Sequence, residues 1–169
     1  MDMNDEDGGR LTCFSPVVDT GCRILILGSM PGVKSLTIQQ YYGHPQNQFW
    51  LMMFDLLGEA PTGDYAAKKA MILRHRIALW DVVRSCTREG SLDTRIRDPE
   101  PNDFKWLFET YPAIGHVYLN GGKAAELYKR LVMKQGIGTD KPYTRLPSTS
   151  PAYTVKYEEK RKAWHIIVD

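Results

Sequence analysis

Hydrophobic positions along the chain fall into short continuous runs, and helical patterns lie between them. The runs cover residues 23–27, 77–83, 114–119 and 143–146. A run of consecutive aliphatic residues, such as residues 24–27, is typical of a strand buried on both faces of a parallel sheet. Apolar residues spaced three and four apart predict helices over residues 47–57, 65–75, 103–111, 123–134 and about 153–167. The alternation predicts an α/β fold, a three-layer αβα sandwich around a short, mostly parallel four-stranded sheet.

Glycine and proline residues fall between these elements, and no internal repeat, low-complexity tract or long linker divides the chain. We therefore expect a single domain over residues 11–169. The first ten residues contain Asp2, Asp5, Glu6 and Asp7, and we expect them to form a disordered acidic leader.

Composition places the chain among ordinary globular domains, with 169 residues of which 43% are hydrophobic and 25% charged. No apolar run approaches the ~18 residues that a membrane helix needs. The N-terminus lacks the basic and apolar parts of a signal peptide, so we expect a cytoplasmic protein without a membrane partner. The net charge of +2, mildly more basic outside the leader, permits an anionic partner without requiring one.

The cysteine pattern excludes two kinds of site. Cys13, Cys22 and Cys86 are odd in number and widely spaced, and no pair has the C-x-x-C spacing. Neither a disulfide framework nor a four-thiolate metal site can be built from them. We expect no metal and no cofactor.

Polar residues follow the carboxyl ends of all four predicted strands. The segments are Gly28-Ser29-Met30-Pro31-Gly32, Trp80-Asp81, Asn120-Gly121-Gly122 and residues 146–153. Ligands in open α/β sheets bind beyond these strand ends, so the four segments should converge on one cleft. Tyr41-Tyr42-Gly43-His44, shortly before Asn47, adds an aromatic pair suited to stacking on a flat ring.

These segments, in this order and spacing, resemble the signature segments of the uracil-DNA glycosylase superfamily. Within it, the chain is most similar to the hypoxanthine-DNA (deoxyinosine) glycosylase branch, from about Phe14 to the C-terminus. Asp81 and the segment Arg88-Glu89-Gly90-Ser91-Leu92-Asp93 also resemble that branch. The resemblance implies a monofunctional enzyme that flips a deaminated base out of double-stranded DNA and hydrolyses its N-glycosidic bond. It also implies a monomer, associated with the nucleoid in a prokaryote.

Particular residues take roles through this resemblance. Residues 28–32, Tyr42, His44, Asp81 and Asn120 would form the base pocket, with Tyr42 stacking on the extruded base and Asn120 reading its edge. The segment Pro147-Ser148-Thr149-Ser150-Pro151 resembles a loop that contacts DNA phosphates in the minor groove. Lys156 and the following helix would add electrostatic attraction through Lys160, Arg161 and Lys162.

Two positions depart from the superfamily pattern. Met30 stands where many relatives carry an Asp or Asn that positions the attacking water, and a thioether cannot do this. We expect the amide oxygen of Asn47 to orient the water instead. Leu146 stands where several relatives carry a His or Asn that stabilises the leaving base. That help would come from Asn120, His44 or backbone N–H groups.

Simpler structural roles compete with these assignments. Asn47 could cap its helix, Asn120 could belong to an ordinary turn, and His44 could stabilise its loop. Asp81 could brace the pocket rather than contact the base. Phe49 and Trp50 are expected in the core.

Other functions remain open at this stage. The pocket could take uracil rather than hypoxanthine, since both bases present the same N–H and carbonyl pattern to Asn120. A non-catalytic module for damaged or single-stranded DNA is a second alternative. A phosphate-ester enzyme would use a similar loop, but the chain has no G-x-x-x-x-G-K-[ST] motif and no acidic cluster for Mg²⁺.

Overall fold

Four parallel strands form the centre of the computed structural model, which describes residues 9–169. The sheet has the order β3-β2-β6-β7, and every neighbouring pair is parallel. The strands are β2 (Ile24–Gly28), β3 (Ile77–Asp81), β6 (His116–Asn120) and β7 (Tyr143–Leu146). The predicted four-stranded sheet is therefore confirmed. Residues 1–8, which hold the acids of the predicted leader, lie outside the described residues.

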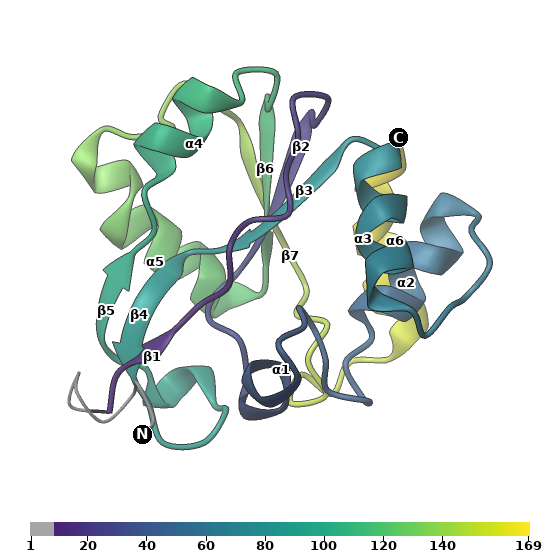
Figure 1. Ribbon diagram of the computed structural model, residues 1–169, viewed down its shortest axis with the longest axis horizontal. Coiled ribbons are helices and arrows are strands. Elements are labelled where there is room, and N and C mark those ends of the chain that lie inside the picture. The colour runs from purple at the N-terminus through teal and green to yellow at the C-terminus, as the bar shows by residue number, and fades with distance from the viewer. Residues whose placement is uncertain (1–8) are drawn as a thin grey trace.

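Helices cover both faces of this sheet (Figure 1). Leu25 and Leu27 of β2 pack in one core with α4 (Phe104–Thr110) and α5 (Gly122–Leu131). Ile26 points the other way and packs with α2 (Phe49–Leu57), α3 (Tyr65–Arg74) and α6 (Tyr157–Trp164). Successive residues of a strand point to opposite faces, so an uninterrupted aliphatic run supplies two cores at once. The three-layer αβα prediction is confirmed.

A second sheet was not predicted from the sequence. It is antiparallel, with the order β1-β4-β5, and consists of β1 (Leu11–Thr12), β4 (Val83–Thr87) and β5 (Arg97–Pro101). The expected strand over residues 77–83 is wrong at its end, because β3 stops at Asp81 and the chain passes into this sheet. Strand β5 has the sequence RDPEP and lies at an edge, where prolines are tolerated and no hydrophobic pattern marks a strand.

Residues just after the undescribed segment are attached to this second sheet. The Arg10 guanidinium donates to the backbone oxygens of Ser85 and Asp98, at 3.2 and 2.7 Å. Arg10 thus holds the start of the described chain against β4 and β5.

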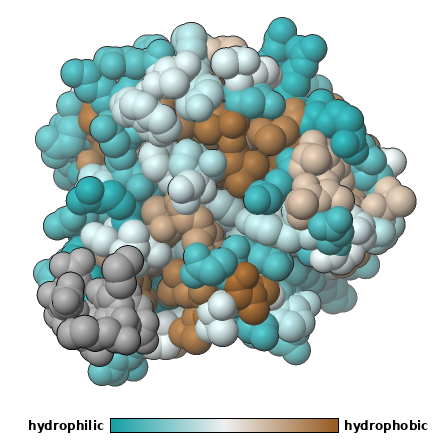
Figure 2. Space-filling model, in the orientation of Figure 1, coloured by the Kyte–Doolittle hydropathy of each residue, from teal (hydrophilic) through white to brown (hydrophobic). Residues whose placement is uncertain are grey.

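Several helices differ from the prediction: α2 begins at Phe49 rather than residue 47, and α5 ends at Leu131 rather than residue 134. Helix α1 (Val33–Ile38) was not predicted, because six residues are too few to show a helical period. It lies at the carboxyl ends of the parallel strands, and Figure 2 shows hydrophobic side chains on the surface over it, where Val33 is half exposed. Helix α6 begins at Tyr157 rather than near residue 153. Within residues 9–169, no helix has the length and apolar character to cross a membrane.

Candidate active site

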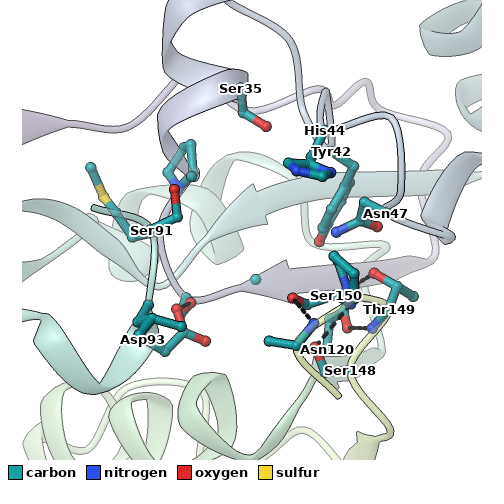
Figure 3. Close-up of a pocket in the computed structure, with 18 of the residues that line it drawn as sticks. Ser35, Tyr42, His44, Asn47, Ser91, Asp93, Asn120, Ser148, Thr149 and Ser150 are labelled. Carbon is teal, nitrogen blue, oxygen red and sulfur yellow. Dashed lines mark hydrogen bonds between the residues drawn. The ribbon is translucent and has the colours of Figure 1, made fainter. Parts of the chain in front are cut away.

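A cavity of about 500 Å³ opens at the carboxyl ends of β2, β3 and β6. Most of the residues predicted to form the site line it: Gly28, Ser29, Met30, Pro31, Gly32, Tyr42, His44, Asn47, Asp81, Asn120, Ser148, Thr149, Ser150 and Pro151. Figure 3 shows Ser91 and Asp93 on one wall of the cavity, and Tyr42, His44, Asn47 and Asn120 on the opposite side. Pro147 and Lys156 were also predicted for the site and are not part of the lining.

The floor of the cavity is formed where β2 and β3 end side by side. Gly28 is paired with Asp81 in the sheet register. A methyl group added at Gly28 would lie 2.6 Å from Asp81 Oδ1 and 3.2 Å from the Tyr42 hydroxyl. Glycine therefore lets a carboxyl group and a phenol approach the same point of the backbone.

Asp81 is a buried carboxyl group without an ion-pair partner. The residue is 3% exposed, and Oδ2 has no hydrogen-bond partner among the described residues. Burial disfavours the charged form, and the nearby charge of Asp93 acts in the same direction. Together they raise the pKa of Asp81 to about 7, against an opposing effect from Arg88. The carboxyl can therefore change its protonation state near neutral pH.

The segment after β4 supplies a wall of the cavity that was not predicted from the sequence. Ser91, Leu92, Asp93 and Thr94 line the cavity. The Ser29 hydroxyl donates to Asp93 Oδ1 at 2.7 Å, and Ser91 Oγ accepts from Val33 N at 2.8 Å. These bonds tie the new wall to the first loop. The only signal in the sequence was the resemblance of residues 88–93 to the hypoxanthine branch, which assigned no role to them.

Tyr42 stacks on Phe49, with ring centroids 4.0 Å apart and an angle of 26° between the planes. Phe49 is buried on the core side, and Tyr42 lines the cavity. The predicted core position of Phe49 is confirmed. Its ring supports one face of Tyr42, so the other face is available to a flat ligand.

Asn47 lies one residue before Gln48, which is the N-cap of α2 and makes no side-chain capping bond. Asn47 Oδ1 accepts from Phe49 N, the first N–H of the helix, at 2.9 Å, which fixes the orientation of the amide. The N-cap position considered for Asn47 is therefore off by one residue, but its side chain does satisfy a backbone N–H at the helix start. An amide oxygen has two lone pairs, and Phe49 occupies one of them. Asn47 also lines the cavity, so this bond leaves room for a second contact.

Asn120 is joined to the loop after β7 by two hydrogen bonds. Its amide nitrogen donates to Thr149 Oγ1 and its oxygen accepts from Thr149 N, both at 3.0 Å (Figure 3). Both residues are buried. Each end of the amide that was predicted to read a base thus already has a protein partner, and Asn120 holds residues 148–150 in place.

The remaining predicted groups lie at the edge of the cavity or outside it. His44 is exposed, and its Nδ1 accepts from Gln46 N at 3.1 Å, as its loop-stabilising role requires. Pro147 accepts from Trp164 Nε1 through its backbone oxygen at 2.8 Å, which ties the loop to α6. Lys156 is exposed at the start of that helix.

Two basic residues of α6 are engaged within the protein. Lys160 is 1% exposed and its Nζ donates to Ser150 O at 3.3 Å. The partly exposed Arg161 forms an ion pair with Asp55 of α2, with Nε 2.7 Å from Oδ2. Lys160 thus supports the loop from behind rather than reaching solvent, and part of the Arg161 charge is offset by Asp55.

Comparison with known proteins now identifies the family. The family model described as the uracil DNA glycosylase superfamily matches residues 15–168. The chain belongs to the uracil DNA glycosylase superfamily. The match includes all four parallel strands and the whole cavity lining.

Two relatives in the superfamily carry a more specific name. A hypoxanthine DNA glycosylase of Methanosarcina acetivorans is 39% identical over 155 residues, which are 91% of this chain and 95% of that protein. A protein of the same name from Methanosarcina barkeri is 37% identical over 152 residues, or 89% and 93% of the two chains.

A solved structure shares the fold. It is a solution NMR structure of a Methanosarcina acetivorans protein described as a uracil DNA glycosylase, with a TM-score of 0.78 and 36% identity. The similarity covers 94% of this chain and 96% of that one. In this superfamily member, no three His, Cys, Asp or Glu side chains within residues 9–169 are grouped as a metal site.

Proposed function

We propose that this protein is a monofunctional hypoxanthine-DNA glycosylase that acts as a monomer on double-stranded DNA. It flips a deaminated base into the cavity and hydrolyses the bond between the base and C1′. The observation that carries the proposal is the cavity itself, because the segments matching the superfamily converge there on one pocket with an aromatic wall and a polar floor. The names of the two curated relatives support hypoxanthine as the base.

Position along the depth of the cavity determines which part of the flipped nucleotide each side chain would meet. DNA remains outside, so the flipped base enters with its Watson–Crick edge first and its glycosidic bond closest to the mouth. The free face of Tyr42 would stack on the base, a contact worth about 1–3 kcal/mol in other stacking sites. Asp81 at the floor would meet the base edge, and the half-buried Asn47 would lie nearer the sugar.

Asn47 would position the attacking water through the second lone pair of its amide oxygen. An amide is too weak a base to remove a proton early. Positioning is sufficient when the glycosidic bond is largely broken before attack. The oxygen of water then bonds to C1′, the base leaves with the electrons of the glycosidic bond, and the proton lost by water balances the charge on the departing base.

The loop of residues 147–151 would contact the DNA backbone. Ser148 and Ser150 line the cavity, and each hydroxyl accepts one backbone N–H of the loop. Their hydroxyl protons would be donated to phosphates at the mouth. Asn120 and Lys160 hold this loop from behind. Lys156, exposed beyond the loop, would add electrostatic attraction.

A paired excision assay tests the proposed function. Duplexes containing deoxyinosine or deoxyuridine are incubated with excess protein and then heated in alkali, which cleaves abasic sites. We expect cleavage at deoxyinosine that depends on the alkali step. Preferred cleavage at deoxyuridine would favour the uracil alternative, and binding without cleavage would favour a DNA-binding module. Strand cleavage before alkali would contradict a monofunctional hydrolase.

The role of Asn47 needs a control for stability, because Asn47→Ala also removes the hydrogen bond to the first N–H of α2. Asp64 offers the match, since its Oδ1 accepts from Ala66 N at the start of α3, away from the cavity. Each Ala variant should lower the free energy of unfolding by ~1 kcal/mol. Only Asn47→Ala should also lower the single-turnover rate, by roughly 100-fold for a lost positioning contact. Equal single-turnover rates for the two variants would mean that Asn47 only stabilises the start of its helix.

A further inference from the structure

We propose that Asp81, with its carboxyl group in the neutral form, pairs with the lactam edge of the flipped base and donates a hydrogen bond to that base as it leaves. The lactam edge is a ring N–H beside a carbonyl oxygen, as in hypoxanthine. This assignment rests on the proposed glycosylase function and names the group that recognises the base and helps it depart.

The placement of Asp81 indicates a ligand rather than a bracing role. A bracing carboxyl would have protein donors on both oxygens, since buried polar groups are normally satisfied. Asp81 Oδ2 is buried and has no partner among the described residues, although the residue lines the cavity. Its bracing contact is made by its backbone oxygen, which accepts from Asn102 Nδ2 at 2.7 Å. The side chain is thus left for the base.

Several competing polar groups in the cavity already have partners, although the buried Tyr42 hydroxyl has none among the described residues. Both ends of the Asn120 amide bind Thr149, and the Ser29 hydroxyl donates to Asp93. Leu146 offers no hydrogen bond where several relatives carry a polar residue. The Tyr42 hydroxyl has a single oxygen, whereas the neutral Asp81 carboxyl carries a donor and an acceptor side by side, so Asp81 is the group that can meet two adjacent atoms of a base.

A neutral carboxyl group matches a lactam edge in both positions. Its carbonyl oxygen accepts from the ring N–H, while its O–H donates to the adjacent carbonyl oxygen. As the glycosidic bond breaks, electron density moves onto the base and its carbonyl oxygen becomes more negative. The hydrogen bond from Asp81 strengthens at that stage, so it stabilises the transition state more than the bound substrate.

The surroundings of Asp81 favour the neutral form. Burial is the largest effect, and Asp93 across the cavity adds a negative charge, while Arg88 opposes both. The other titratable groups facing it are Tyr41, Tyr42 and Cys13, whose pKa values are all raised by burial, so they are uncharged at neutral pH. A bound base displaces water and favours the neutral carboxyl further.

Two substitutions at Asp81 separate hydrogen bonding to the base from ionisation of the carboxyl group. Asp81→Asn keeps one acceptor and one donor but cannot ionise, whereas Asp81→Leu keeps the approximate volume and loses both. Single-turnover excision of hypoxanthine should fall about tenfold per pH unit above the wild-type transition near pH 7. Asp81→Asn should stay within about tenfold of the wild-type rate at pH 6 and lose this pH dependence. Asp81→Leu should lose at least about 100-fold.

Unsubstituted purine provides the second readout, because it lacks both the ring N–H and the carbonyl oxygen. The same duplex is prepared with deoxynebularine, which carries this base. The loss caused by Asp81→Leu should be at least about tenfold smaller on purine than on hypoxanthine. A purely structural defect would lower both rates equally, and that result would overturn the assignment.

Tyr128→Phe is the matched control for disturbing a buried group. The Tyr128 hydroxyl is likewise buried without a partner, but it lies on α5 and does not line the cavity. Its removal should change neither the rate nor the pH profile. A wild-type rate that rises with pH through the Asp81 transition would overturn the neutral form. Failure of the wild-type protein to excise either deaminated base would instead overturn the proposed function, and the role of Asp81 with it.

Discussion

At the scale of single residues, the structure separates side chains with spare hydrogen-bonding capacity from those already in use. Asp81 and Asn120 end β3 and β6, the strands on either side of β2, and both are buried. Asn120 is bonded to Thr149, whereas Asp81 Oδ2 has no partner among the described residues. The sequence predicted both as pocket residues but assigned base reading to Asn120. Residue type and position could not reveal the hydrogen bonds, because Thr149 is 29 residues away in the chain.

Asn120→Ala should destabilise the protein as well as impair excision. It would leave the buried Thr149 N–H and hydroxyl without their partners, at about 1–3 kcal/mol for each unsatisfied group. We expect the free energy of unfolding, measured by urea denaturation, to fall by about 2–4 kcal/mol. In combination with Thr149→Val the losses should be less than additive. A stable Asn120→Ala variant that only binds DNA poorly would argue for direct base reading.

At the scale of elements, local hydrophobic patterns predicted the central strands correctly. They did not predict the elements whose structure depends on packing against distant parts of the chain. The aliphatic run of β2 predicted a buried parallel strand because both of its faces are covered. Strand β5, with the sequence RDPEP, and the six residues of α1 have no such pattern. They are defined by what they pack against, so the wall carrying Asp93 could not be placed from sequence.

The end of β2 gives an element-level prediction. Gly28→Ala would place a methyl group 2.6 Å from Asp81 Oδ1, so the carboxyl group must move. We expect single-turnover excision to fall by roughly 100-fold, the cost of a misplacement of about 1 Å. Gly63→Ala is the control, since nothing lies within 4 Å of a methyl group there. Comparable rates for the two variants would show that the spacing at Gly28 is not critical.

At the scale of the whole molecule, the site exists only through assembly. None of the four polar segments identifies the site by itself. They meet because the parallel strands end at one edge of the sheet, as predicted from the position of each segment after a strand. The charge state of the floor is a further consequence of assembly, because burial by all the surrounding elements raises the pKa of Asp81. Such a charge state cannot be read from the sequence.

The free energy of unfolding should depend on pH through the protonation of Asp81. Its pKa is 3.8 ordinarily and about 7 in the folded protein, so the folded state holds this proton more tightly. Between about pH 4 and 7 the unfolded chain loses this proton while the folded protein keeps it. The free energy of unfolding therefore falls as pH rises, by on the order of a few kcal/mol in total.

Asp55 and Glu100, whose pKa values are lowered by hydrogen bonds from arginines, change the free energy of unfolding in the opposite direction. Subtracting wild-type from Asp81→Asn stabilities at each pH, by urea denaturation, cancels them. The difference should grow from pH 4 to 7 and then level off, whereas a constant difference would mean that Asp81 ionises in the folded protein at its ordinary pH.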